Sequence, residues 1–270
     1  MSSWNFTEGD AIAPGRTSVR LLGGGRRYEA HLAWDDELHA LVVVKVVRPH
    51  LVHDENALRG LGREALALRS LAHPMLVRGF DAVLDGERPH IVLEFLEGPR
   101  LSTLLRRYGA TIEQLLPLAV NVCSALHYMH ARGWVHLDVK PSNLVMGASP
   151  RLIDLSVARR FDELPTLSSP VGTDGYMAPE QRDLARVGEL GPATDVWGLG
   201  ATLREALAGR PVPPVVAALV DACLAPRPAD RPSPAELAAE LEPLAAALPR
   251  PRIGPMRPGG RRRMRELELR

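Results

Sequence analysis

The segment over residues 136–143 concentrates residue types that can carry out chemistry. It reads His136-Leu137-Asp138-Val139-Lys140-Pro141-Ser142-Asn143 and places an acid, a lysine and an amide two and three residues apart. A carboxylate can accept a proton, an ammonium group can neutralise negative charge, and an amide oxygen can bind a hard cation. This segment is therefore the first candidate for a reaction centre.

Lysine is almost absent from the rest of the chain. Of 33 basic residues only Lys45 and Lys140 are lysine, a bias that arginine-favouring codons of a GC-rich genome would produce. Arginine replaces lysine on a solvated surface, but not where a compact charge on a flexible stem must reach one position. The two remaining lysines therefore mark candidate functional positions.

The elements that must position these residues fall into two unlike halves. Residues 18–96 have the pattern of strands interrupted by one helix, and residues 112–248 have the pattern of helices. Lys45 lies in the β-branched run Leu41–Val47, where a buried lysine needs an anionic partner, and Glu64 lies in an amphipathic helix over 55–72. We expect another strand over 91–96 and helices over 115–131, 195–208, 215–224 and 234–248.

The order of these motifs resembles that of eukaryotic-type (Hanks-type) serine/threonine protein kinases of the bacterial kind, over residues 18–248. Besides the segment 136–143, the landmarks are Leu22-Gly23-Gly24-Gly25, Val42-Val43-Val44-Lys45, Glu64, Asp154, Gly172-Thr173, Ala178-Pro179-Glu180, Asp195-Val196-Trp197-Gly198-Leu199-Gly200 and Arg231. Each is weak alone, and the three glycines by themselves would indicate a hairpin turn. Their joint order and spacing carry the resemblance.

The resemblance implies an α+β, bilobal protein-kinase fold. Residues 18–96 would form a small β-rich N-lobe with one helix, and residues 97–248 a larger, mainly helical C-lobe. Residues 1–17 would be a lead-in. Residues 249–270, with eight arginines against Glu266 and Glu268, would be a basic tail, for which a disordered end is favoured over contact with nucleic acid, an anionic membrane or an acidic partner.

The resemblance also implies roles for the site residues. Asp138 would accept or orient the proton of the attacking hydroxyl, and Lys140 would neutralise the γ-phosphate of ATP. Asn143 and Asp154 would bind Mg²⁺ or Mn²⁺. The remaining nucleotide-binding positions would be the loop Leu22, Gly23, Gly24 and Gly25, the adenine roof Ala30 and Val43, the phosphate-holding Lys45 with its partner Glu64, and the backbone of Glu94 and Leu96. Asp195 and the pair Glu180 and Arg231 would be structural.

Several positions depart from the family pattern. Tyr28 stands where a third loop glycine is usual, which predicts weaker loop closure but not loss of nucleotide binding. Leu155-Ser156 follows Asp154 in place of phenylalanine and glycine. Leu137 replaces the arginine that pairs with a phosphorylated activation segment. We therefore expect activity that needs no phosphorylation at Thr166, Ser168, Ser169 or Thr173.

The C-lobe is also shortened. The chain passes from the helix ending near Ala208 to the helix at Val215, without the helix that family members carry near 211–215. Its absence would uncover apolar surface, and such a patch usually marks an interface. We expect a homodimer or a dedicated partner there.

The composition fits a folded enzyme inside the cell. The chain has 270 residues, 46% of them hydrophobic, and a net charge of +1. It shows no signal peptide, no apolar run long enough to span a membrane and only two cysteines, so a cytoplasmic protein with reduced thiols is expected. Nucleic-acid binding is not expected.

The function implied is ATP-dependent phosphorylation of serine or threonine hydroxyls on a protein. Two alternatives stay open: a pseudokinase that binds a nucleotide or a partner as a scaffold, and a kinase with a small-molecule acceptor. All six charged or metal-facing positions of the family are retained, namely Lys45, Glu64, Asp138, Lys140, Asn143 and Asp154, which favours the active enzyme. The stretch from Gly172 to Glu180 resembles a peptide-binding shelf.

Overall fold

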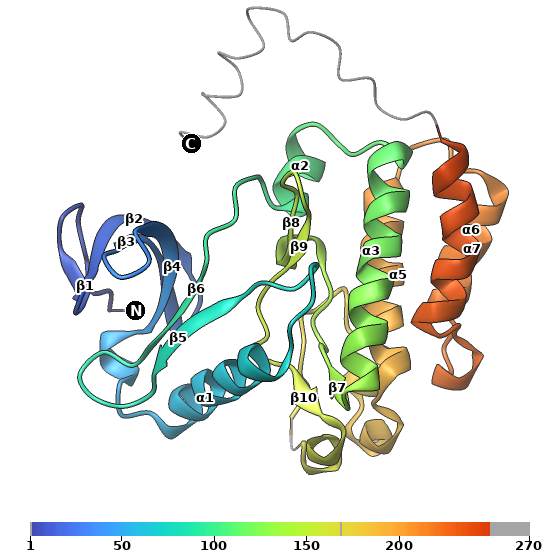
Figure 1. The fold of residues 1–270 in the computed structure, drawn as a ribbon. Coiled ribbons are helices and arrows are strands. Elements are labelled where there is room, and N and C mark those ends of the chain that lie inside the picture. The colour runs from blue at the N-terminus through green and yellow to red at the C-terminus, as the bar shows by residue number, and fades with distance from the viewer. Residues whose placement is uncertain (1, 168, 249–270) are drawn as a thin grey trace, which may run out of the picture.

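The protein folds into two lobes joined by one extended segment after β6 (Figure 1). This computed structural model describes residues 2–167 and 169–248. The N-lobe is a curved antiparallel sheet with one long helix, and the C-lobe is mainly helical. The predicted α+β bilobal fold is confirmed. The predicted basic tail, 249–270, lies outside the described residues.

The N-lobe sheet has six strands in the order β1-β2-β3-β4-β6-β5. Their bounds are β1 Ala11–Ala13, β2 Arg16–Gly24, β3 Tyr28–Asp35, β4 Ala40–Val47, β5 Gly79–Val83 and β6 His90–Glu94. Alternation along β4 decides which face each side chain takes. Val42 and Val44 are buried on one face with Ile12 and Val92, while the other face presents Lys45.

Helix α1 (Glu55–Ser70) covers that other face. It begins at Asp54, whose carboxylate accepts the Ala57 amide hydrogen over 2.7 Å and so satisfies one of the free N–H groups of the first turn. Its apolar stripe, including Leu61, packs on Ile91 of β6. The packing fixes the side of α1 that faces the sheet, and Glu64 lies on that side.

The C-lobe is built around α3, which is buried along most of its length and packs against α5 and α7. The helices are α2 Leu101–Arg107, α3 Ile112–Ala131, α4 Pro179–Arg182, α5 Pro192–Leu207, α6 Pro214–Cys223 and α7 Pro234–Ala247, and the short strands are β7 Trp134–Val135, β8 Leu144–Val145, β9 Arg151–Leu152 and β10 Arg159–Arg160. Short 3₁₀ helices occupy Pro49–Leu51, Pro141–Asn143, Phe161–Thr166, Leu184–Glu189 and Pro228–Asp230. The β strands carry the loops that form the site.

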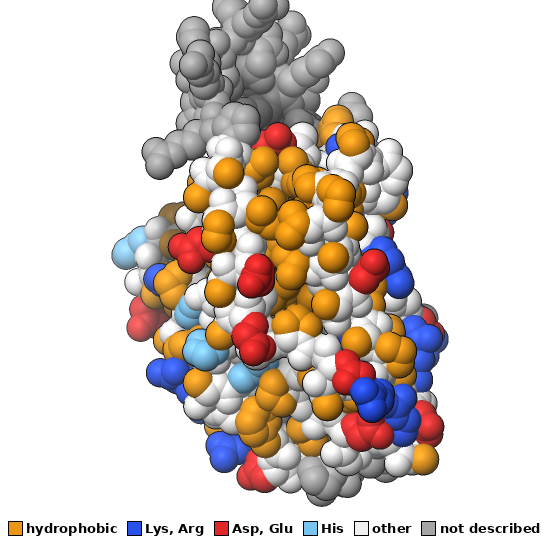
Figure 2. Space-filling model, turned by 90° about the vertical axis from the view of Figure 1, so that its right-hand side faces the viewer, with side chains coloured by type: hydrophobic (Ala, Val, Ile, Leu, Met, Phe, Trp, Pro, Cys, Tyr) orange, Lys and Arg blue, Asp and Glu red, His pale blue; other side chains and the backbone are white. Residues whose placement is uncertain are grey.

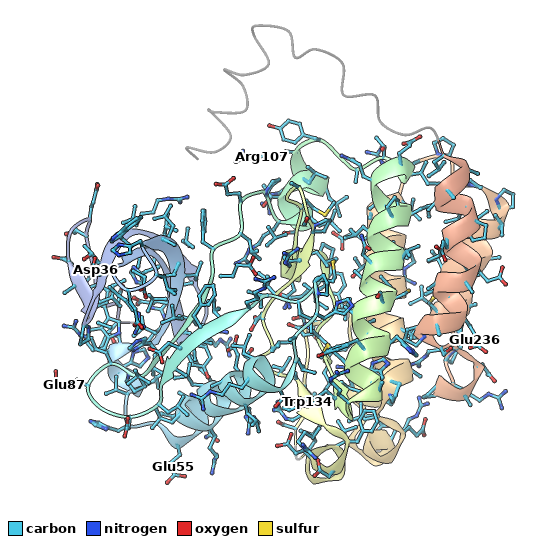
Figure 3. All side chains as sticks on the ribbon, viewed as in Figure 1. Asp36, Glu55, Glu87, Arg107, Trp134 and Glu236 are labelled. Atoms are coloured by element: carbon cyan, nitrogen blue, oxygen red, sulfur yellow. The ribbon has the colours of Figure 1, made fainter. Side chains whose placement is uncertain are left out.

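The side chains reflect this layout (Figure 3). Asp36, Glu55 and Glu87 project from the rim of the N-lobe, whereas Trp134 is buried among the elements of the C-lobe core. Both cysteines, Cys123 and Cys223, are buried in that core, where burial raises the pKa of each thiol to about 12. They are free thiols that serve packing, as the sequence predicted.

The predicted central strands and helices are present, and the structure differs from the prediction at the start of the sheet and in one short helix. Strand 41–47, helix 55–72 and the later helices correspond to β4, α1, α3, α5, α6 and α7. The sheet begins at Ala11, so part of the segment assigned to the lead-in, residues 1–17, pairs with β2 and is not separate from the lobe. Helix α2 was not predicted, because its seven residues are too few for a clear period.

Residues 208–213 connect α5 to α6 without a helix. Next to this connection Val215 is 45% exposed. Figure 2 shows hydrophobic side chains along the face that α6 and α7 present, with acidic side chains among them. Of the helices in the described ranges, none is long and apolar enough to cross a bilayer.

Candidate active site

Lys45 forms the first of two charged clusters in the site. It stands in the middle of β4, opposite Ala30 on one neighbouring strand and Ile91 on the other. Its ammonium group contacts Glu64 of α1 at 2.7 and 3.0 Å and Asp154, after β9, at 3.0 Å. The anionic partner that the buried lysine requires is therefore present, and the contact joins the sheet, α1 and the C-lobe.

Burial and charge act against each other in this cluster. Desolvation lowers the pKa of Lys45, but Glu64 and Asp154 outweigh it and hold that pKa above its usual value. Desolvation also works to raise the pKa of Asp154, and Lys45 with Ser156 outweighs it, so this carboxylate is ionised. Glu64 behaves differently, because burial raises its pKa to about 7 despite the opposing pull of Lys45.

Asp138 forms the second cluster. One carboxylate oxygen, Oδ2, accepts hydrogen bonds from Lys140 Nζ at 2.6 Å and from Asn143 Nδ2 at 3.0 Å. The other, Oδ1, accepts the hydroxyl hydrogen of Thr173 at 2.7 Å. Lys140 also contacts the Thr173 hydroxyl oxygen at 2.5 Å. The geometry brings together the predicted catalytic pair and adds Thr173 to it.

Asp195 holds the loop that carries Asp138. Its two carboxylate oxygens accept the backbone N–H groups of His136 at 2.8 Å and Leu137 at 2.7 Å, and one also contacts the His130 ring at 2.9 Å. Leu137 has φ of 64°, in the left-handed region, which costs about 1–3 kcal/mol for a side chain of this kind. The buried Asp195 at the N-terminal end of α5 stabilises this strained turn, which confirms its structural role.

Glu180 and Arg231 form the predicted structural ion pair. Arg231 binds both carboxylate oxygens of Glu180, at 2.6 and 2.9 Å, and neither side chain is exposed. Thr194 donates a further hydrogen bond to Glu180 at 2.9 Å. The pair connects the end of residues 154–180, here called the activation segment, to the 3₁₀ turn before α7. Arg231 also stacks on the ring of Trp197, with 4.9 Å to its centre.

Asn143 and Asp154 have the donor atoms that a magnesium site needs. The hydrogen bonds of Asn143 to Asp138 use its amide nitrogen, which leaves the carbonyl oxygen as a hard donor. Asp154 has φ of 68° and gives Oδ1 to Lys45. One amide oxygen and one carboxylate fit Mg²⁺, which keeps several waters and binds few protein oxygens.

The loop of Leu22, Gly23, Gly24 and Gly25 covers the same side of the sheet as Lys45. Residues 23 and 24 belong to β2, paired with Ala30 and Glu29. Gly24 leaves no room for a side chain, since a Cβ would lie 2.7 Å from the Tyr28 carbonyl oxygen. A glycine is therefore required here for the tight β2–β3 turn.

The residues predicted to contact adenine differ in how well their positions suit that role. Ala30 and Val43 lie on adjacent strands, β3 and β4, near one another as a roof requires. The amide of Glu94 donates to the Arg78 carbonyl at 2.9 Å, so this amide is not free for a nucleotide. Leu96 follows β6, and in the described part of the chain its amide and carbonyl have no backbone partner.

The sequence patterns did not predict the contacts that three residues of the site make. Thr173 was recognised as a landmark but not as a partner of Asp138. Leu137 is 3% exposed and packs with Leu164 of the activation segment in an apolar cluster. Tyr28 reaches α1. All three contacts join distant segments, which residue spacing does not encode.

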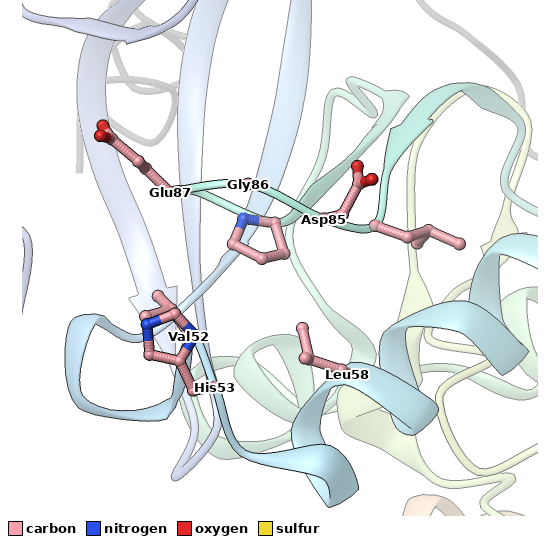
Figure 4. Close-up of a pocket in the computed structure, with 8 residues that line it drawn as sticks. Val52, His53, Leu58, Asp85, Gly86 and Glu87 are labelled. Atoms are coloured by element: carbon pink, nitrogen blue, oxygen red, sulfur yellow. The ribbon is translucent and has the colours of Figure 1, made fainter.

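A separate hollow lies away from this chemistry, between the start of α1 and the β5–β6 connection (Figure 4). Its lining includes Val52, His53, Leu58, Asp85 and Glu87. A second hollow begins at the residue after Thr173 and is lined by Asp174, Gly175, Tyr176, Ala201, Arg204, Glu205 and Ala208.

A two-lobed fold with these two charged clusters at the lobe boundary defines a protein kinase. The sequence profile described as "Protein kinase domain" matches residues 16–215, and the chain belongs to this family.

Among curated proteins it is similar to bacterial serine/threonine-protein kinases. PknB of Mycobacterium tuberculosis is 33% identical over 202 residues, covering 71% of this chain and 32% of that protein. PkaA of Streptomyces coelicolor is 31% identical over 239 residues, covering 77% of this chain and 44% of that protein. The chain thus spans less than half the length of these relatives.

Proposed function

We propose that this protein is an ATP-dependent serine/threonine protein kinase. The observation that carries the proposal is the joint assembly of Lys45, Glu64 and Asp154 at 2.7–3.0 Å, beside an Asp138 that holds Lys140 at 2.6 Å. Phosphoryl transfer depends mainly on positioning and charge neutralisation, and these are the groups that supply both. The names of the relatives agree with the same activity.

Each residue has a role that its geometry supports. Lys45, held by Glu64, would bind the α- and β-phosphates of ATP, and Lys140 would neutralise the γ-phosphate. Asp138 would orient the acceptor hydroxyl and take its proton. Asn143 and Asp154 would hold Mg²⁺ or Mn²⁺, which would supply positive charge to neutralise the phosphates.

The acceptor is proposed to be a protein rather than a small molecule. Starting at the residue after Thr173, the surface carries a hollow lined in part by Asp174, Tyr176 and Glu205. The Tyr176 hydroxyl donates to the Glu205 carboxylate, which fixes one wall of it. An extended chain can lie along such a surface, whereas a small molecule is bound by an enclosed pocket.

Activity is proposed not to depend on phosphorylation of the activation segment. Leu137, in place of an arginine, is buried with Val135 and Leu164, and Leu167 and Val171 pack against them. Gln181 adds hydrogen bonds to the carbonyl oxygens of Leu137 at 2.8 Å and Val171 at 2.6 Å. Apolar burial and these bonds hold the segment where a phosphate–arginine pair would otherwise be needed. Of the hydroxyls considered earlier, Ser168 lies outside the described residues.

The test compares wild type with Asp138→Asn, using labelled ATP, Mg²⁺ or Mn²⁺, and a mixture of peptides. Label on serine or threonine with wild type only, located by mass spectrometry, is the expected result. Asn keeps the size of Asp and removes the proton acceptor, so nucleotide binding should persist in the variant. ATP binding without transfer by wild type would instead support the scaffold alternative, and label on a small molecule only would support the other.

A homodimer or a dedicated partner is proposed at the α5–α6 connection. The support is the exposed Val215 and the apolar face of α6 and α7 (Figure 2). Light scattering of the purified chain tests the first case. A dimer that Val215→Glu converts to a monomer is expected, and a monomer at all concentrations together with no effect of Val215→Glu on substrate phosphorylation would contradict both cases.

A further inference from the structure

Tyr28, the first residue of β3, reaches from the sheet to α1. Its hydroxyl donates to the Ala57 carbonyl oxygen of α1 at 2.8 Å. The Lys45 ammonium group lies 5.0 Å from the centre of its ring, a distance at which a cation is attracted to the ring face. Burial raises the pKa of the phenol, so the hydroxyl keeps its proton and remains a donor. Tyr28 thus contacts two of the elements that form the Lys45–Glu64 pair.

Gly60 of α1 is shaped to receive this side chain. A Cβ at position 60 would lie 2.5 Å from the Tyr28 hydroxyl oxygen, closer than real Cβ atoms approach. Glycine inside a helix costs roughly 0.5–1 kcal/mol relative to alanine, so the position is unfavourable for α1 alone. Glycine at position 60 is explained by the Tyr28 side chain, which occupies the space that a Cβ would need.

The contact lies on the face of α1 that presents Glu64. Gly60 is one helical turn before Glu64, and Ala57 is two turns before it, so all three lie on one side of the helix. A shift of α1 away from the sheet would break the Tyr28–Ala57 bond and the Glu64–Lys45 contacts together. The first contact therefore restricts the motion that would open the second.

We propose that Tyr28 is a positioning residue that holds α1 against the sheet and so keeps Glu64 on Lys45. The proposal rests on the proposed kinase function. The proposal gives Tyr28 a function at a position where glycine is usual in the family. Tyr28 would restrain α1 from within the N-lobe, without any phosphate group.

The test uses Tyr28→Phe, Tyr28→Gly, Gly60→Ala and the double variant Tyr28→Gly/Gly60→Ala. Tyr28→Phe removes one hydrogen bond and should lower kcat by about threefold to tenfold. Tyr28→Gly should lower it further, and Gly60→Ala should lower it by displacing the ring. In the double variant Gly60→Ala should do no further harm, because the tyrosine it displaces is gone.

Gly62→Ala is the matched control. A Cβ at Gly62 would lie 3.9 Å from the nearest atom, an ordinary contact with Leu84, so the same change in the same helix should leave kcat unaltered. Thermal melting of every variant separates loss of positioning from loss of folding. The KM for peptide should stay constant in all of them.

Amide hydrogen exchange across α1 gives a readout that does not depend on phosphoryl transfer. Faster exchange in the middle of α1 is expected for Tyr28→Gly relative to wild type and for Gly60→Ala relative to Gly62→Ala, which gains the same helix propensity, with unchanged exchange in α3. If wild type transfers no phosphate, the kinase proposal fails while this readout still decides the role of Tyr28. Unchanged α1 exchange, or a kcat that rises in Tyr28→Gly, would overturn the inference.

Discussion

The hydroxyl of Thr173 donates its hydrogen to Asp138 over 2.7 Å, on the carboxylate oxygen that Lys140 and Asn143 leave free. Asp138 is thereby bound on both oxygens and held in a single orientation. Thr173 belongs to the activation segment and Asp138 to the loop after β7, so the contact makes the position of the acid depend on the path of that segment.

Replacing Thr173 by alanine should lower kcat. A hydrogen bond to a charged group contributes about 1.5–3 kcal/mol, which corresponds to about tenfold or more in rate. Thr173→Ser keeps the hydroxyl and should restore most of the activity. Steady-state kinetics on one peptide decide the matter, and equal activity in Ala and Ser variants would show that the hydroxyl is not needed.

The two lysines should not tolerate arginine. Lys45 places one nitrogen within 3.0 Å of Glu64 and Asp154, and a planar guanidinium with a longer reach cannot occupy that point. Lys45→Arg and Lys140→Arg should each reduce transfer by at least about tenfold with little change in melting temperature. The exposed Arg59→Lys is the control swap. Near-normal turnover in both variants would contradict this prediction. The presence of two lysines in an arginine-rich chain would then have no functional explanation.

Phosphatase treatment of wild type should leave activity unchanged. Truncating the buried Leu164 to alanine removes packing against Leu137, and such changes cost about 2–5 kcal/mol, so the segment should loosen and kcat should fall. Leu38→Ala, on a leucine that is 44% exposed, is the control. Activity that disappears on dephosphorylation would contradict this account of the segment.

Activity should rise with pH through neutrality. The pKa of Glu64 is raised to about 7, so its charged form, which holds Lys45, is lost as the pH falls below that value. Between pH 8 and pH 6 the ionised fraction falls from about nine-tenths to about one-tenth, which bounds the expected drop in rate. The residual activity of Glu64→Gln, measured over the same range, should lack this limb. An identical profile in both proteins would assign the titration to another group.

Arg48 should control nucleotide affinity through the glycine-rich loop. Its guanidinium donates to the Gly25 carbonyl at 2.8 Å, to the buried Glu29 at 2.8 Å and to the Ser2 carbonyl at 3.0 Å. Arg48→Met should free the loop and raise the KM for ATP, by at most about tenfold to a hundredfold, because a charged hydrogen bond contributes roughly 1.5–3 kcal/mol. The KM for peptide should not change.

Two variants refine that measurement. Trp4→Ala removes the indole that donates to the Val47 carbonyl at 2.8 Å and should have a smaller effect of the same kind. Arg59→Met, on the exposed face of α1, removes equal charge without touching the loop. A shift in KM for ATP that is the same for Arg48→Met and Arg59→Met would reflect net charge alone.

The sequence predicted the central elements because these rest on local pattern, whereas the roles of the site residues were implied by the family resemblance. The β-branched run around Lys45 and the helical period around Glu64 are visible in short windows, and the structure places these two residues 2.7 Å apart. The sequence also implied the buried acid at Asp195.

The remaining contacts depend on tertiary packing. Tyr28 looked like a defect in a glycine-rich loop, since nothing in its neighbourhood reveals that Gly60 lies opposite. Strand β1 has three residues and little pattern, so the start of the sheet was placed too late. Thr173 approaches Asp138 from 35 residues away, a distance along the chain that no spacing rule covers.

The Glu180–Arg231 pair limits the substitutions that the C-lobe can accept during evolution. Both side chains are wholly buried, and removing one partner of such a pair costs about 3–5 kcal/mol because the other charge is left without compensation. Replacing both by apolar residues can cost far less. Glu180 and Arg231, which are 51 residues apart in the sequence, can therefore be replaced during evolution only when both change together. A single substitution at either position is too destabilising to be accepted.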